Sequence, residues 1–164
     1  KIKLGGYIMY FIGVVIFIAF LVCTTLLSGC LALFIDFPSI LIILAFSIPM
    51  LMASGLFADF IRAFKIMSKR VNVWSMIELN RTEISLRLAI KLILFSGLLG
   101  SIISVISILS RINNMAHIGQ NLAVSIITML YSILITFILL PVQAKVKSMI
   151  ITMDKEYIDE ETAK

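Results

Sequence analysis

The sequence has few charges and few of the residues that support metal or redox chemistry. Only 14% of its 164 residues are charged, 61% are hydrophobic, and its mean hydropathy is +1.13. A water-soluble fold needs more polar residues than this to cover its core, so an ordinary soluble globule is excluded. The single histidine, His117, and two cysteines, Cys23 and Cys30, form no cluster with metal-ligand spacing, so we expect no metal or other cofactor. The cysteines would lie two turns apart on one helix, and we expect both to be free thiols.

Long apolar runs are what the sequence has in excess. Four runs, 7–34, 37–60, 88–110 and 118–142, each exceed the roughly 20 residues that a helix needs to cross hydrocarbon. We therefore predict an all-α polytopic membrane protein with four transmembrane helices, forming one membrane domain over residues 1–164. Asp36 and Pro38 turn the first two runs into a hairpin. An amphipathic link is predicted over 61–87, and a tail over 143–164 is expected to continue the last helix.

The basic residues predict the orientation of the chain. Arg111 alone lies between the third and fourth runs, whereas the other lysines and arginines flank the termini and the central link. By the positive-inside rule, both termini and the link are then cytoplasmic. The net charge of +5 is explained by this topology, and no nucleic-acid partner is expected.

Small and polar residues recur on one face of each of the last two runs. In the third run these are Gly97, Gly100, Ser101, Ser104 and Ser107. In the fourth they are Asn121, Ser125, Thr128, Ser132 and Thr136, spaced three or four apart. Small residues let membrane helices approach closely, and hydroxyls can also line a polar pathway. Both interpretations stay open, and they are compatible with each other.

No carboxylate is expected at mid-membrane, because Asp36 and Asp59 fall at the edges of runs and the others lie in the link and tail. A proton exchanger normally keeps an ionisable residue there, so a partner would have to supply it. Asp59 and Arg62 are spaced as an interfacial helix pair. Pro49 should bend the second helix, and Pro141 is either a fixed kink or a hinge near the end of the fourth.

Three segments resemble the MotA/TolQ/ExbB proton-channel superfamily, and within it the MotA-type stator subunits. FIDFPSILIIL (34–44) resembles their hairpin and second helix, and GLLGSII (97–103) their third-helix segment. IGQNLAVSIITMLYS (118–132), with LLP (139–141), is similar to their fourth helix. MotA-type proteins carry a large cytoplasmic domain where this chain has only its short link. The resemblance is therefore to a compact form, which favours an envelope machine other than the flagellar motor.

The resemblance implies a homopentamer around a dimer of single-span partners of the MotB, TolR or ExbD type, each with a membrane aspartate. It implies a bacterial cytoplasmic (inner) membrane location and proton flow converted into rotation or force, with no enzyme activity. The inner wall of the ring would be formed by the polar faces, Gly97, Gly100, Ser101, Ser104, Asn121, Ser125, Thr128, Ser132 and Thr136, with Pro141 shaping the exit. A second threonine of the family falls on Met129, which favours protons over sodium. The alternatives are a structural subunit of a larger membrane complex and a small four-span transporter.

Overall fold

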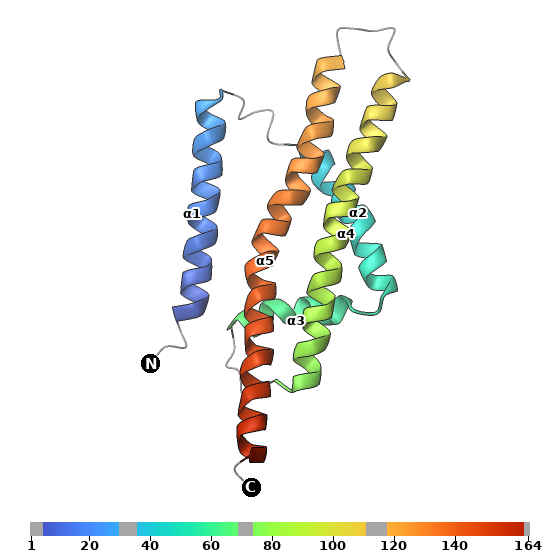
Figure 1. Ribbon diagram of the computed structural model, residues 1–164. Coiled ribbons are helices and arrows are strands. Elements are labelled where there is room, and N and C mark those ends of the chain that lie inside the picture. Colours follow the sequence, from blue (N-terminus) through green and yellow to red (C-terminus); the bar gives the residue numbers. More distant parts are fainter. Residues whose placement is uncertain (1–4, 30–35, 69–73, 111–117, 163–164) are drawn as a thin grey trace.

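The computed structural model describes residues 5–29, 36–68, 74–110 and 118–162, and all the regular structure in this part of the chain is helical. The helices are α1 (Gly5–Leu27), α2 (Phe37–Ala53), α3 (Phe57–Ser68), α4 (Met76–Leu109) and α5 (Ile118–Thr162) (Figure 1). The predicted all-α class is confirmed. Three of the described helices are long and apolar enough to cross a membrane, or up to four if α2 and α3 together make one bent span. The chain is thus a polytopic membrane protein.

The long helices α4 and α5 run antiparallel, with α2 packed against them and α1 standing apart at one side (Figure 1). The core lies among α2, α3, α4 and α5, where Ile43, Ile66, Leu86 and Val142 are fully buried. The contacts that hold α1 include the stacked rings of Phe17 and Phe137. The start of α1 and the end of α5 lie at the same end of the bundle, which also carries the exposed basic side chains of α4; we call this the basic end. The positive-inside prediction requires such an arrangement.

The first apolar run forms a shorter helix than the sequence suggests. We predicted a span over 7–34, but α1 ends at Leu27, because Gly29 adopts a φ of 66° and bonds its N–H to the Leu26 carbonyl. A glycine in this left-handed conformation terminates a helix without steric cost. Of the cysteines, Cys23 is a free, exposed thiol, and Cys30 lies outside the described residues.

The second run does not continue to Phe60 as one helix. Asp36 occupies the N-cap position of α2, and Pro38 lies in the first turn as expected. However, α2 ends at Ala53 and the chain turns by 105° into α3. Gly55, with a φ of 70°, allows that turn. Hydropathy alone gave no sign of the break, because the residues on both sides of it are apolar.

The predicted link over 61–87 is helical but divided. Its first part belongs to α3, whereas its last part begins α4, which runs without interruption through the predicted third span. The start of α4 is fixed by a capping box, in which the Ser75 hydroxyl accepts from the Glu78 N–H and the Glu78 carboxylate accepts from the Ser75 N–H. The expectation that the fourth span runs on as a helix is confirmed, since α5 continues to Thr162.

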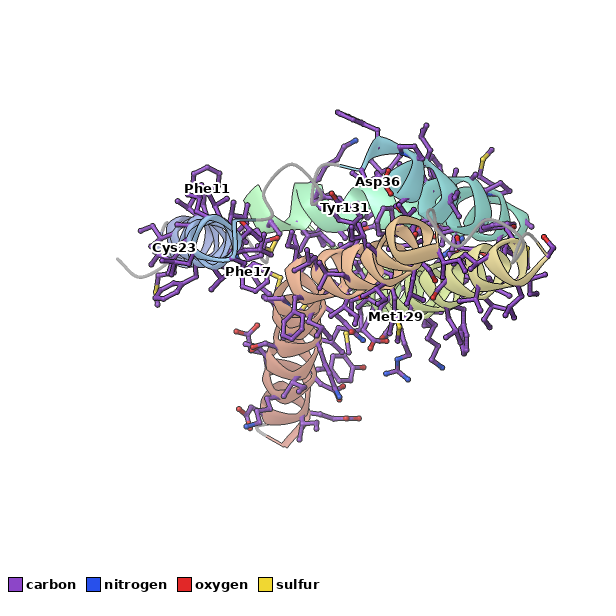
Figure 2. All side chains as sticks on the ribbon, turned by 90° about the horizontal axis from the view of Figure 1, so that it is seen from above. Phe11, Phe17, Cys23, Asp36, Met129 and Tyr131 are labelled. Carbon is purple, nitrogen blue, oxygen red and sulfur yellow. The ribbon has the colours of Figure 1, made fainter. Side chains whose placement is uncertain are left out.

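Neither proline inside a helix ends it. Pro49 lies exposed within α2, and the large change of direction comes five residues later at Ser54. Pro141 lies exposed within α5, which changes direction part-way along its length when seen from above (Figure 2). This direction change is consistent with the predicted kink, because a proline removes one backbone hydrogen bond of the helix.

A buried carboxylate joins α3 to α4. Asp59 is only 3% exposed and accepts from Arg62, the pair predicted from the sequence, and also from Arg81 of α4 at 3.2 Å. Nearby, the Ser85 hydroxyl donates to the Leu56 carbonyl at 2.8 Å. These bonds hold α3 across the basic end of the bundle.

We expect Asp59→Asn to lower the free energy of unfolding by about 2 kcal/mol, because both arginines lose a charged acceptor. Denaturant titration of the purified protein in detergent measures the change. Asp154→Asn, in the exposed part of α5, is the matched control and should leave the stability unchanged. Equal stability of the two variants would show that the Asp59 contacts do not hold α3 in place.

Candidate functional site

Polar side chains from three helices meet inside the otherwise apolar bundle. We call this set the hydroxyl seam: Ser39 of α2, Ser101 of α4, and Ser125, Thr128, Ser132 and Thr136 of α5. Its four α5 members are between 0% and 7% exposed, and Ser39 is 0% exposed. Burying a hydroxyl in an apolar environment costs free energy unless the group is hydrogen-bonded. The hydrogen-bond partners of these side chains therefore show which helices the seam connects.

Two glycines allow α4 and α5 to approach closely enough to form the seam. A Cβ atom on Gly97 would lie 2.2 Å from the Ser132 Oγ, and one on Gly100 would lie 3.0 Å from the Thr128 Cγ2. The α4 backbone therefore rests directly on the polar face of α5. This is the close approach that small residues permit between membrane helices.

At Ser101 and Ser125, the seam joins α4 and α5 through serine hydroxyls. Ser125 donates to the Ser101 carbonyl at 2.9 Å, and the two hydroxyl oxygens lie 3.0 Å apart. Ser132 donates within its own helix to the Met129 carbonyl. The Thr136 Oγ1, by contrast, is buried without a hydrogen-bond partner.

A hydrogen-bonded chain leads from a carboxylate into the seam. Ser39 donates to Asp36 Oδ2, the Ser39 and Thr128 hydroxyl oxygens lie 2.7 Å apart, and Thr128 is 3.0 Å from the Val124 carbonyl. The Asp36 N–H donates to the Tyr131 hydroxyl at 3.2 Å, and Figure 2 shows these two residues side by side.

Asp36 is partly exposed at the start of α2 and contacts α5 part-way along that helix. Its expected place at a membrane edge stays a prediction. Tyr131, which contacts it, is thirteen residues into α5, or about 20 Å from the start of that helix. The exposed large side chains of α4 are apolar from Leu94 to Leu109, and Gly100, beside Thr128, is near the middle of this stretch. Hydropathy could locate the start of α2 but not its depth relative to α5.

The structure brings most of the predicted site residues together, in contacts within one chain. Gly97 and Gly100 are buried against α5. The four seam residues of α5 are buried as well. Ser101 and Ser104 are partly exposed on α4, and Ser104 donates to the Gly100 carbonyl of its own helix. The side chain of Asn121 lies outside the described part of the chain. The packing interpretation thus holds for the single chain, and the lining of a ring stays a prediction.

A second polar contact lies near the basic end and was missed by the sequence analysis. Glu83, 8% exposed, accepts from Arg87 at 2.8 Å and from Gln143 of α5 at 3.3 Å. The i,i+4 spacing of Glu83 and Arg87 is a signal that could have found the first pair. No sequence signal connects Glu83 to Gln143, sixty residues away.

The arrangement connects the Asp36 carboxylate to hydroxyl groups of α2 and α5. Among the described residues, no three histidine, cysteine or carboxylate side chains are grouped so that they could hold a metal ion. The hydroxyls beside Asp36 form a hydrogen-bonded chain that joins α2 to α5. No family model, curated protein or solved structure matches the chain.

We expect Gly97→Ala to destabilise the bundle by about 1–3 kcal/mol, because the added Cβ would overlap Ser132. Denaturant titration in detergent measures the loss. A second change, Ser132→Gly, should restore part of it by removing the overlapping atoms. Gly13→Ala is the control, since nothing lies within 4 Å of its added Cβ. If Gly97→Ala is as stable as this control, the close approach of α4 and α5 is refuted.

Proposed function

We propose that the chain is a ring-forming subunit of a proton-driven membrane machine in a bacterial inner membrane. In this proposal it conducts protons together with an aspartate-bearing single-span partner and converts the flow into rotation or force. The resemblance of residues 34–44, 97–103 and 118–132 to the MotA/TolQ/ExbB superfamily supports it. The observation that carries it is the hydrogen-bonded chain from the partly exposed Asp36 to the fully buried Ser39 and Thr128.

In this proposal, Asp36 takes part in proton transfer together with the partner's aspartate. The sequence analysis assigned proton transfer to the partner's aspartate alone, but this chain has a carboxylate of its own that is bonded to a buried hydroxyl of the seam. Ionisable groups in membrane interiors are rare and usually functional. We assign Asp36 the role of accepting protons and Ser39 and Thr128 the role of relaying them. Ser101, which contacts Ser125 and is partly exposed, would connect the seam to the partner helix.

The first experiment counts subunits. The tagged chain is purified from its native membrane with whatever copurifies, and native mass spectrometry gives its stoichiometry. We expect a pentamer with a dimer of a protein that has one span and an aspartate near its start. A monomeric or dimeric chain would contradict the ring.

The second experiment measures proton flux through that purified complex in vesicles containing a pH-sensitive dye. We expect Asp36→Asn and Thr128→Val each to reduce the flux by about tenfold or more, because each removes a proton-transfer group. Thr128→Ser keeps the hydroxyl and should keep much of the flux. Thr152→Val is the matched control, because the Thr152 hydroxyl is exposed and bonds only to its own helix. Normal flux in both Asp36→Asn and Thr128→Val would refute the relay.

A structural subunit of a larger membrane complex is the second candidate, favoured by the complete burial of Thr128 and near-complete burial of Ser132 within one chain. Side chains so enclosed act as packing surfaces. This candidate predicts that Thr128→Val lowers assembly and activity together. The proton-driven ring predicts reduced flux from a complex that still assembles, and the stoichiometry of the variant distinguishes the two.

A further inference from the structure

Helix α3 is fixed across the end of the bundle rather than along it. It follows the 105° turn after α2, and the Ser85 and Arg81 side chains of α4 bind its first residues. If α4 and α5 cross the membrane, a helix in this orientation lies close to the membrane plane. Figure 1 shows α3 at the level where α1 begins, which is the basic end.

The outer side of α3 has more exposed apolar side chains than a helix at a water-exposed surface. Its inner side carries the buried carboxylate of Asp59 together with Ala63, Ile66 and Met67. Its outer side carries the residues that we call the α3 strip: Phe57, Ile61, Phe64 and Lys65. Ile61 is 44% and Phe64 48% exposed, and the spacing of the strip places its members on one side of the helix. Such a surface suits an apolar phase with charged groups at its border.

The level of α3 coincides with the border of the apolar surface of α4. Arg81, Arg87 and Lys91 are exposed on α4, and from Leu94 onward its exposed large side chains are apolar. Because Arg81 and Ser85 of α4 bind Asp59 and the Leu56 carbonyl, the start of α3 lies at the level of this band of cations.

Positive charge is in excess at this border. The described residues between 57 and 91 include five basic and three acidic side chains. Two of the acidic ones, Asp59 and Glu83, are already bound by arginines of the chain. None of the ion pairs found in the described part of the chain involves Lys65 or Lys91. A binding partner that complements this region would carry negative charge next to an apolar layer.

We propose that the α3 strip, together with Lys91, binds anionic phospholipid headgroups at the membrane surface of the basic end. Phe57, Ile61 and Phe64 enter the boundary between headgroups and acyl chains, as apolar faces of interfacial helices do. Lys65 and Lys91 bind lipid phosphates, and their long stems reach from apolar surroundings to the headgroups. This site is independent of the proposed proton path.

The depth of α3 can be measured because Trp74 is the one tryptophan of the sequence. The variant Trp74→Phe with Phe64→Trp places a single fluorophore on the α3 strip of the full chain. In bilayers we expect lipids brominated near the headgroup to quench it more strongly than lipids brominated near the chain end. Tyr157→Trp in the Trp74→Phe background is the control, since Tyr157 is 69% exposed near the end of α5 and should not be quenched. No quenching at position 64 would overturn the proposal, and would fit a second copy of the chain covering the strip.

Headgroup selectivity is tested by native mass spectrometry of the full chain with phosphatidylglycerol or phosphatidylcholine added. We expect tighter binding of phosphatidylglycerol, and about fivefold weaker binding in Lys65→Gln and in Lys91→Gln, since one basic residue contributes about 1 kcal/mol at an anionic surface. Lys155→Gln, the same change in the exposed tail of α5, should bind as the unmodified chain does. Equal affinity for the two lipids, or an equal loss in all three variants, would overturn the proposal.

Discussion

The close approach of α4 and α5 is the constraint on which the rest of the structure depends. Gly97 and Gly100 have no side chains, so the α4 backbone meets Ser132 and Thr128 directly. In a bilayer, the hydrophobic effect does not drive helices together, and tight packing and interhelical hydrogen bonds must do so. The bond from Ser125 to the Ser101 carbonyl is one such contact. The helix pair then provides the surface on which α2 and α3 pack.

The same contact explains how an apolar bundle tolerates a carboxylate. Because Thr128 is held against α4, its hydroxyl faces Ser39, and Ser39 in turn binds Asp36. A charged group in an apolar region needs hydrogen-bond donors, and this short chain supplies one of them. Packing and proton transfer therefore use the same side chains, which is why a variant must keep assembly and lose flux before a conducting role can be assigned.

Charge is arranged differently at the basic end. There, Asp59 and Glu83 bind arginines and connect α3 and α5 to α4, so their carboxylates serve the fold. Lys65 and Lys91 remain for a partner outside the chain, and anionic lipid fits their position. Asp59 and Glu83 thus have arginines as neighbours, whereas Asp36 has hydroxyls. Of these three carboxylates, Asp36 is the one bonded to the hydroxyl seam.

The sequence by itself determined the helical class, the membrane environment and the face on which small and polar residues of α4 and α5 meet. Hydropathy and helical periodicity are local properties, so runs of apolar residues and three-to-four spacing suffice for these predictions. Only the tertiary structure decided that α2 ends at Ala53, that α3 turns across the bundle, and that Asp36 lies beside Tyr131. These features depend on the positions of the helices along one another and on contacts such as that of Asp59 with Arg81. Such contacts join residues far apart in the sequence, and a local sequence pattern does not predict them.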